Sequence, residues 1–446
     1  MKKRLAYLFL ALTLVVLALY LFRYKRALVI ESKIPITATE VVQIDLRQIE
    51  HHLLVDALKN PFKYISFETK KKEDHASFKK AIVIPRNILF FTNDSNFKSA
   101  WFSSFFKLKD RTELENYLLQ QGFKTLTDEA LELFGKGNIV VAISSENVLI
   151  AYKKQSHAPV NAVIQSIFNE TEFYKKDVDL LKPILNSKSD ITYVSSKDAF
   201  LEADFKNGLF EIKGKLHSNL FLADSYVPYS EGALAFLSTK INRNHAIFKS
   251  LLTNKNKTKF REFTKLSMDS IVNHWNGHLL FNLKAINKEI DTIVTYEYDD
   301  DFNKIEKKSV QENNVPHTAI ALGSDAKLFE YFYTNNAIQV VENDTLFTAM
   351  PLYKMYAQKQ KKSLTIFTQK LFDSSMLKAE KYKLNAHMDI NRYLENPLEF
   401  SLIPVKNNYL QLLGRTSAKL TTNDELLIQV WLKESNRNFL GQFIKP

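Results

Sequence analysis

An uninterrupted apolar stretch near the amino terminus constrains this chain more than any other feature. Residues Leu5 to Phe22 read LAYLFLALTLVVLALYLF, eighteen residues without a charged side chain. As an α-helix the stretch would be about 27 Å long, at about 1.5 Å per residue, which is close to the hydrocarbon thickness of a bilayer. We therefore expect a single transmembrane helix that anchors the rest of the chain in a membrane.

We expect this anchor to be retained rather than cleaved. A signal peptide has a shorter apolar core followed by small residues, whereas here Arg23, Lys25 and Arg26 follow the stretch at once. A lipoprotein would need a cysteine to acylate, and the chain has none. Basic residues stand on both sides of the stretch. A long domain after an amino-terminal basic-then-apolar segment nevertheless favours an amino terminus inside and the bulk of the chain outside the cytoplasm.

The composition excludes several classes of function. Six of the twelve net positive charges flank the apolar stretch, so the remainder is only mildly basic and we predict no nucleic-acid partner. The absence of cysteine rules out disulfides, thiolate zinc sites and a cysteine nucleophile, and favours a bacterial envelope. No glycine-rich phosphate-binding motif occurs among the 10 glycines, and we predict no cofactor.

Local signals predict an α+β fold with mainly antiparallel sheets. Asn207-Gly208 between alternating residues is typical of a two-residue β-hairpin. Asp110, with Glu113 three residues later, predicts the start of a capped helix. Asp325 and Asp389 each follow a strand-like run and are expected to cap helices in the same way. Strands and helices do not alternate strictly, which favours α+β over a parallel α/β sheet.

Further elements are read from hydrophobic periodicity. A helix after Asp45 is expected to bury one apolar stripe, made of Ile49, Leu53, Leu54, Ala57 and Leu58. The expected strands of the carboxyl-terminal half are Leu279–Ala285, Thr292–Tyr298, Ile305–Gln311, Tyr409–Leu420 and Leu426–Leu432, the last two joined by a turn at residues 422–424.

The domain organisation rests on a recurring pattern. Pro35 precedes Ile44-Asp45 and a helix, much as Pro228 precedes Ile241-Asn242 and a helix. Two interpretations stay open: duplication of one lobe, or the ordinary succession of strand and capped helix in α+β chains. We predict a cytoplasmic tail (1–4), a transmembrane helix (5–22), a linker (23–33) and two α+β lobes (34–225 and 226–446).

Two groups of residues are candidate ligand contacts. Asp299, Asp301 and Asn303 match the first three ligand positions of a calcium loop, but Lys304 and Val310 stand where the loop needs glycine and a carboxylate. A polar hairpin turn is therefore favoured over a metal site. The densest basic run is expected to form a solvated helix or loop, with contact to anionic lipid or polymer as the functional alternative; it comprises Lys255, Lys257, Lys259, Arg261 and Lys265.

Other motifs are incomplete. His274 and His278 have the spacing of two ligands on one helix face, but Gly277 is expected to end the helix between them. Ser104 and Lys107 fit S-x-x-K without its companion motifs, and in a strand they face opposite sides. Adjacent His51 and His52 do not point the same way. No complete catalytic constellation is present.

The openings Pro35–Leu46 and Pro228–Asn242 resemble those of bacterial single-pass envelope proteins of unknown function. The resemblance implies an inner-membrane protein with its bulk in the periplasm, and no functional residues. We expect a binding or scaffold protein whose partners are the bilayer, through residues 5–22, and an envelope protein or polymer. The alternatives are an envelope hydrolase with a site between the lobes and a membrane-tethered domain facing the cytoplasm.

Overall fold

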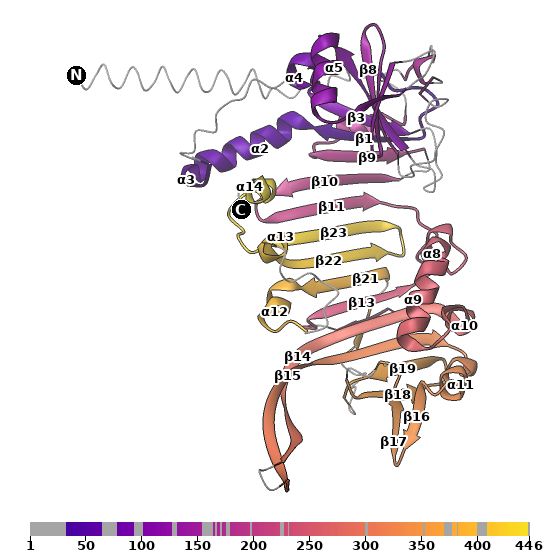
Figure 1. The fold of residues 1–446 in the computed structure, drawn as a ribbon. Helices are drawn as coiled ribbons and strands as arrows, with labels where there is room; N and C mark the ends of the chain where they lie inside the picture. The colour runs from indigo at the N-terminus through magenta and orange to yellow at the C-terminus, as the bar shows by residue number, and fades with distance from the viewer. Residues whose placement is uncertain are drawn as a thin grey trace, which may run out of the picture. The chain divides into compact units, whose positions relative to one another are not determined.

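Figure 1 shows the computed structural model of the chain. It describes residues 33–64, 78–92, 101–126, 132–153, 164–165, 167–169, 172–174, 179–196, 199–223, 227–230, 232–298, 302–350, 353–369, 377–380, 382–398 and 408–444. The predicted span Leu5–Phe22 lies outside these residues. Within them, no helix has both the length and the apolar character needed to cross a bilayer.

The chain divides into two compact units. Unit 1 contains the residues up to Leu216 together with those from Asn436 onward, and unit 2 runs from His217 to Ser435. The boundary predicted from the sequence lay nine residues later, and that prediction placed the carboxyl terminus in the second lobe. The carboxyl-terminal residues belong to unit 1 because they contact helix α2 through the buried carboxylate of Asp56.

Unit 1 combines short helices with a large antiparallel sheet. Its strands are β1 (Glu40–Asp45), β2 (Ile82–Val83), β3 (Asn87–Thr92), β4 (Trp101–Leu108), β5 (Lys124–Leu126), β6 (Glu132–Lys136), β7 (Ile139–Ile143), β8 (Asn147–Lys153), β9 (Ile191–Ser195), β10 (Phe200–Lys206) and β11 (Leu209–Lys215). Its helices are α2 (Leu46–Lys59), α3 (Pro61–Tyr64), α4 (Phe78–Ala81), α5 (Arg111–Gln120), α7 (Lys182–Asn186) and α14 (Phe439–Ile444).

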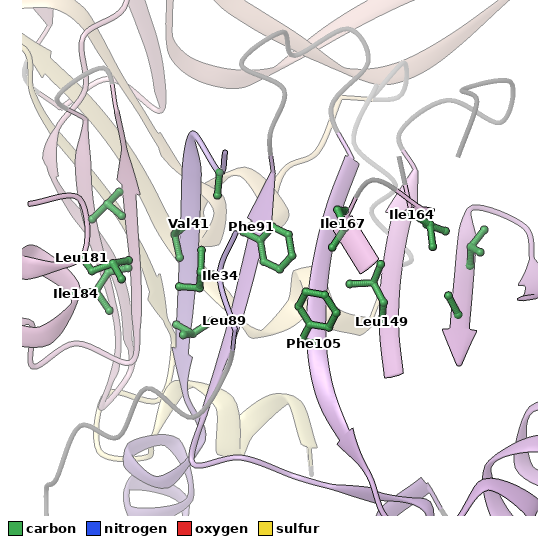
Figure 2. Packing of buried hydrophobic residues seen from close by; sticks show 14 of the residues in the cluster. Ile34, Val41, Leu89, Phe91, Phe105, Leu149, Ile164, Ile167, Leu181 and Ile184 are labelled. Atoms are coloured by element: carbon green, nitrogen blue, oxygen red, sulfur yellow. The ribbon is translucent and has the colours of Figure 1, made fainter. Parts of the chain in front are cut away.

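The larger core cluster of unit 1 lies on one face of this sheet. Val41, Phe91 and Phe105 come from three neighbouring strands and point to the same side, where Ile164 and Ile184 pack onto them (Figure 2). Each of these five side chains is almost fully buried. A second cluster includes Leu114 and Leu118 of α5, which occupy one helix face at i and i+4.

Unit 2 also combines helices with an antiparallel sheet. Its strands are β12 (Val227–Ser230), β13 (Ala235–Lys240), β14 (Trp275–Tyr298), β15 (Lys304–Ser324), β16 (Ile338–Val341), β17 (Asp344–Phe347), β18 (Met355–Lys359), β19 (Ser363–Phe367), β20 (Leu377–Glu380), β21 (Tyr382–Asp389), β22 (Leu413–Thr421) and β23 (Glu425–Leu432). Its helices are α8 (Ala246–Leu251), α9 (Asn254–Thr264), α10 (Met268–His274), α11 (Ala326–Thr334), α12 (Ile390–Glu395) and α13 (Asn408–Leu412).

The two units have the same order of strands. In unit 1 the hydrogen-bonded neighbours run β11-β10-β9-β1-β3-β4-β8-β7-β6-β5. In unit 2 they run β23-β22-β21-β13-β14-β15-β19-β18-β17-β16. Position by position, the strands of each series also follow one another in the same sequence along the chain. All pairings among the described residues in these series are antiparallel, which confirms the predicted α+β class.

The helix caps and the hairpin turn predicted from short sequence motifs are confirmed. Asp110 caps α5 by accepting from the Glu113 backbone at 3.0 Å. Asp325 and Asp389 cap α11 and α12 in the same way, both at 3.0 Å. Asn207-Gly208 joins β10 to β11 as a two-residue turn, with Lys206 paired to Leu209 and Gly208 at a φ of 59°.

Three predictions were wrong in their extent or burial. Helix α2 does not bury the expected apolar stripe: Leu54 is 41% and Leu58 70% exposed, and the buried side chain is Asp56, which faces α14. The segment from Tyr409 to Leu412 is helical, because α13 precedes β22. The strands expected at 279–285 and 292–298 are one strand, β14, because the intervening residues from Ile286 to Asp291 also pair with β15.

Candidate functional site

Three neighbouring strands of unit 2 place a grid of mostly polar side chains on one face of the sheet. On β21, β22 and β23 the directly opposed residues share a face, and residues two apart along a strand share it as well. The register therefore gives three rows: Asp389, Arg415 and Trp431; His387, Ser417 and Gln429; Asn385, Lys419 and Leu427. An antiparallel sheet would ordinarily present such a face to water.

This grid borders a cavity of about 390 Å³. All nine grid residues line the cavity, and Arg392 of α12 joins them together with Gly232 and Ala233, which precede β13. Arg392 is held over the site because its Nη1 atom donates to the Gly232 carbonyl at 3.3 Å. The size suits a small molecule or one group of a larger one.

More positively than negatively charged side chains line the cavity. Arg392, Arg415 and Lys419 line it, and Asp389 is the one carboxylate among the described lining residues. Asp389 Oδ1 already accepts from the Arg392 backbone N–H at 3.0 Å as the cap of α12. The Arg415 guanidinium lies 4.1 Å from the centre of the Trp431 ring, so a cation–π contact fixes its position. The charge of the cavity lining therefore favours an anionic group.

His387 lies at the wall of the cavity and donates a hydrogen bond to the backbone there. Its ring stacks on Phe236 with centroids 5.7 Å apart, and its Nε2 atom lies 3.1 Å from the Ala233 carbonyl oxygen. Since a carbonyl oxygen only accepts, Nε2 carries a hydrogen. Ser417 stands opposite His387 in the register of β21 and β22.

The predicted calcium-loop residues do not form a described site. Asp299 and Asp301 lie outside the residues that the structure describes, and Asn303 follows the turn residue Phe302, whose φ is 61°. Across the described part of the chain, no three histidine or carboxylate side chains come together in a way that could hold a metal ion.

The basic run forms most of helix α9. Lys255, Lys257, Lys259 and Arg261 lie within the helix, and Lys265 ends it in the left-handed region at a φ of 62°. Lys257 pairs with Asp269 at 2.8 Å. None of these residues lines the cavity, and their contact with an anionic surface remains a prediction.

Neither of the two histidine pairs in the sequence lies at the cavity. Helix α10 ends at His274, Gly277 lies in β14 at a φ of 99°, and His278 is part of the strand, so His274 and His278 do not share a helix face. In unit 1 His52 lies 3.4 Å from the buried Asp190, and the proximity of this carboxylate raises the pKa of His52. Ser104 is buried in β4, three residues from Lys107.

Sequence reasoning missed the cavity. Its local signal was the alternation of Arg415, Ser417 and Lys419 along one strand, with Gln429 and Trp431 along the next. Alternation of this kind is ordinary for a half-exposed sheet, and the third strand, β21, lies 23 residues before β22. The site depends on the order of strands in space.

Comparisons with known proteins identify no function. No protein-family model matches the chain, and no curated protein matches it. Crystal form I of TP0453 from Treponema pallidum is similar over 76% of this chain and 93% of that chain, with 10% identity and a TM-score of 0.23. Crystal form IV of the same protein covers 76% and 92%, with 10% identity and a TM-score of 0.22. A likeness at this TM-score carries no argument about function.

Proposed function

We propose that this chain is a membrane-anchored extracytoplasmic binding protein of a bacterial envelope, and that the cavity of unit 2 binds an anionic group of its ligand. The observation that carries the proposal is the set of three cations around that cavity, opposed by one carboxylate that is already engaged as a helix cap. A carboxylate or a phosphate would complete the contacts of Arg415, because both match the guanidinium group in shape.

Other lining groups support recognition of a polar ligand. Ser417 and Gln429 belong to the middle row of the grid, beside His387. Hydroxyl and amide groups both donate and accept hydrogen bonds, so they can contact the neutral part of a molecule whose charge lies at Arg415. Trp431 adds an apolar surface next to them.

Anion binding is tested by thermal unfolding of the full chain in detergent. Inorganic phosphate and citrate are expected to raise the unfolding temperature in a saturable manner, because a ligand that binds only the folded state stabilises it. Sodium chloride at equal ionic strength is the control for screening. The same small shift with all three salts would contradict a specific site.

The anchor and the lobes complete the proposal. Residues 5–22 would span the inner membrane with the amino terminus inside, and a linker (23–33) would connect them to the two units. The shared order of strands in the two units supports the interpretation that the lobes arose by duplication, since the same antiparallel series occurs twice along the chain.

Extraction of membranes with alkaline carbonate tests the anchor. The full chain is expected to stay in the membrane pellet, because a helix of eighteen apolar residues is held by the hydrocarbon core rather than by charge. A variant lacking residues 1–26 is the matched control and is expected in the supernatant. Release of the full chain by carbonate would contradict the anchor.

A further inference from the structure

The β14–β15 hairpin of unit 2 continues past the sheet as a two-stranded arm. Strand β13 pairs with β14 only as far as Leu283, and β19 pairs with β15 only from Ala319 onward. Beyond these points, within the described residues, β14 from Ala285 and β15 up to His317 pair only with each other (Figure 1). Fourteen residues of strand, from Ala285 to Tyr298, span about 45 Å. A two-stranded ribbon of this kind is marginally stable in water unless something covers it.

One face of the arm carries exposed apolar side chains among charged ones. Ile290, Val294 and Tyr296 alternate along β14 and therefore point to the same side, and the register places Val310 of β15 on that side too. Their side chains are 67%, 41%, 52% and 69% exposed, in that order. Lys304 Nζ lies 3.6 Å from the centre of the Tyr296 ring. Four exposed apolar side chains on one face are nevertheless more than scattered surface residues, and they indicate a docking surface.

The charges on this face are complementary to those on a second copy of the same face. Glu312 lies opposite Ile290 and Lys308 lies opposite Val294, so the two charges flank Val310 at equal distances along β15. A two-fold axis that crosses the strands at Val310 would place Glu312 of one copy against Lys308 of the other. The same operation places Ile290 against Val294, and symmetry makes each contact twice.

We propose that this face of two arms packs against its own copy about a two-fold axis at Val310, so that the partner of this surface is a second copy of the chain. Apolar contact at Ile290, Val294 and Val310 supplies the attraction. The Glu312 to Lys308 pairs set the register, because a slip along the strands would bring like charges together. This inference does not depend on the anion site.

Cross-linking through single cysteines tests the packing. Since the chain has no cysteine, Val310→Cys introduces a unique thiol, and a short bis-maleimide reagent applied to the full chain in its membranes reports whether two copies meet there. Ser309→Cys is the matched control, because Ser309 is the exposed neighbour on the opposite face. A cross-linked dimer is expected at least about tenfold more abundant for Val310→Cys.

Exchange of the charges of Glu312 and Lys308 distinguishes their contact between two copies from the ion pairs that each residue makes within one copy. Glu312→Lys or Lys308→Glu alone is expected to lower the dimer yield about tenfold, since each creates two like-charge contacts by symmetry. The double variant restores the pairing between copies and is expected to recover the yield. It does not restore the pairs within one copy, Lys288 with Glu312 at 3.3 Å and Lys308 with Glu306 at 3.2 Å.

Three results would overturn the proposal. Equal cross-linking at positions 309 and 310 would mean that the arms meet without a preferred face. A cross-link from position 310 to a different protein would assign the surface to another partner. Failure of the double variant to recover the yield would show that Glu312 and Lys308 do not face each other across the axis.

Discussion

Replacement of Asp56 by alanine is expected to lower the free energy of unfolding of unit 1 by about 3–5 kcal/mol. The Asp56 side chain is 3% exposed and holds three donors. Its Oδ2 atom accepts from the Tyr64 hydroxyl, and Oδ1 accepts from Asn60 Nδ2 at 3.2 Å and from the Asn438 backbone N–H at 2.8 Å. Truncation would leave the buried Asn438 N–H without its acceptor and would remove the partner of the Tyr64 hydroxyl, which costs more than the loss of an exposed hydrogen bond.

The same carboxylate holds the carboxyl-terminal helix against α2. Gly441 of α14 packs so closely that a Cβ atom there would lie 2.6 Å from Asp56 Oδ2 and 2.2 Å from Tyr64 Oη. Burial and the neighbouring carboxylate raise the pKa of Tyr64 to about 12, so its hydroxyl keeps its proton and donates throughout the neutral range. We therefore expect Asp56→Ala to release residues 436–444 before the rest of unit 1 unfolds.

Denaturant unfolding of the full chain in detergent, with hydrogen exchange at the Asn438 and Gln442 amides, measures both effects. Asp110→Ala is the matched control, because it removes an exposed aspartate that accepts a single backbone hydrogen bond and is expected to cost about 1 kcal/mol. A loss for Asp56→Ala no larger than that of Asp110→Ala would contradict the role assigned to the buried carboxylate.

The predictions that the structure confirms at single residues are those that depend only on neighbouring residues in the sequence. Asp110, Asp325 and Asp389 bond backbone groups within three residues, and the Asn207-Gly208 turn depends on the conformation of two residues. Such chemistry is complete within a short window, so the printed sequence contains all of its partners.

Features that depend on distant residues were not predictable in this way. The helix after Asp45 looked like an amphipathic helix buried through its leucines, yet its buried side is Asp56, whose partner Asn438 lies 382 residues away. The cavity likewise needs β21 beside β22 and Gly232 near α12. Periodicity gives the side on which a residue lies and does not identify which strand will be its neighbour.

Reversal of the charge of Arg415 has the largest effect expected on ligand binding. Arg415→Glu removes a guanidinium from the row formed with Asp389 and Trp431, and adds a second carboxylate to the cavity. The loss of a charge-assisted hydrogen bond and the new repulsion together amount to about 2 kcal/mol or more, which corresponds to a roughly thirtyfold weaker affinity. Lys433→Glu, on unit 2 but outside the cavity lining, controls for the change in net charge.

The most direct measurement is a titration of the full chain with inorganic phosphate followed by tryptophan fluorescence. Trp431 reports on the site because Arg415 lies over its ring, and Trp431→Phe identifies its share of the signal from the three tryptophans. An anion-binding cavity predicts a saturable change that disappears in Trp431→Phe and shifts about thirtyfold to higher phosphate in Arg415→Glu, while Lys433→Glu titrates like the natural chain. An unchanged midpoint in Arg415→Glu would contradict anion binding at this site.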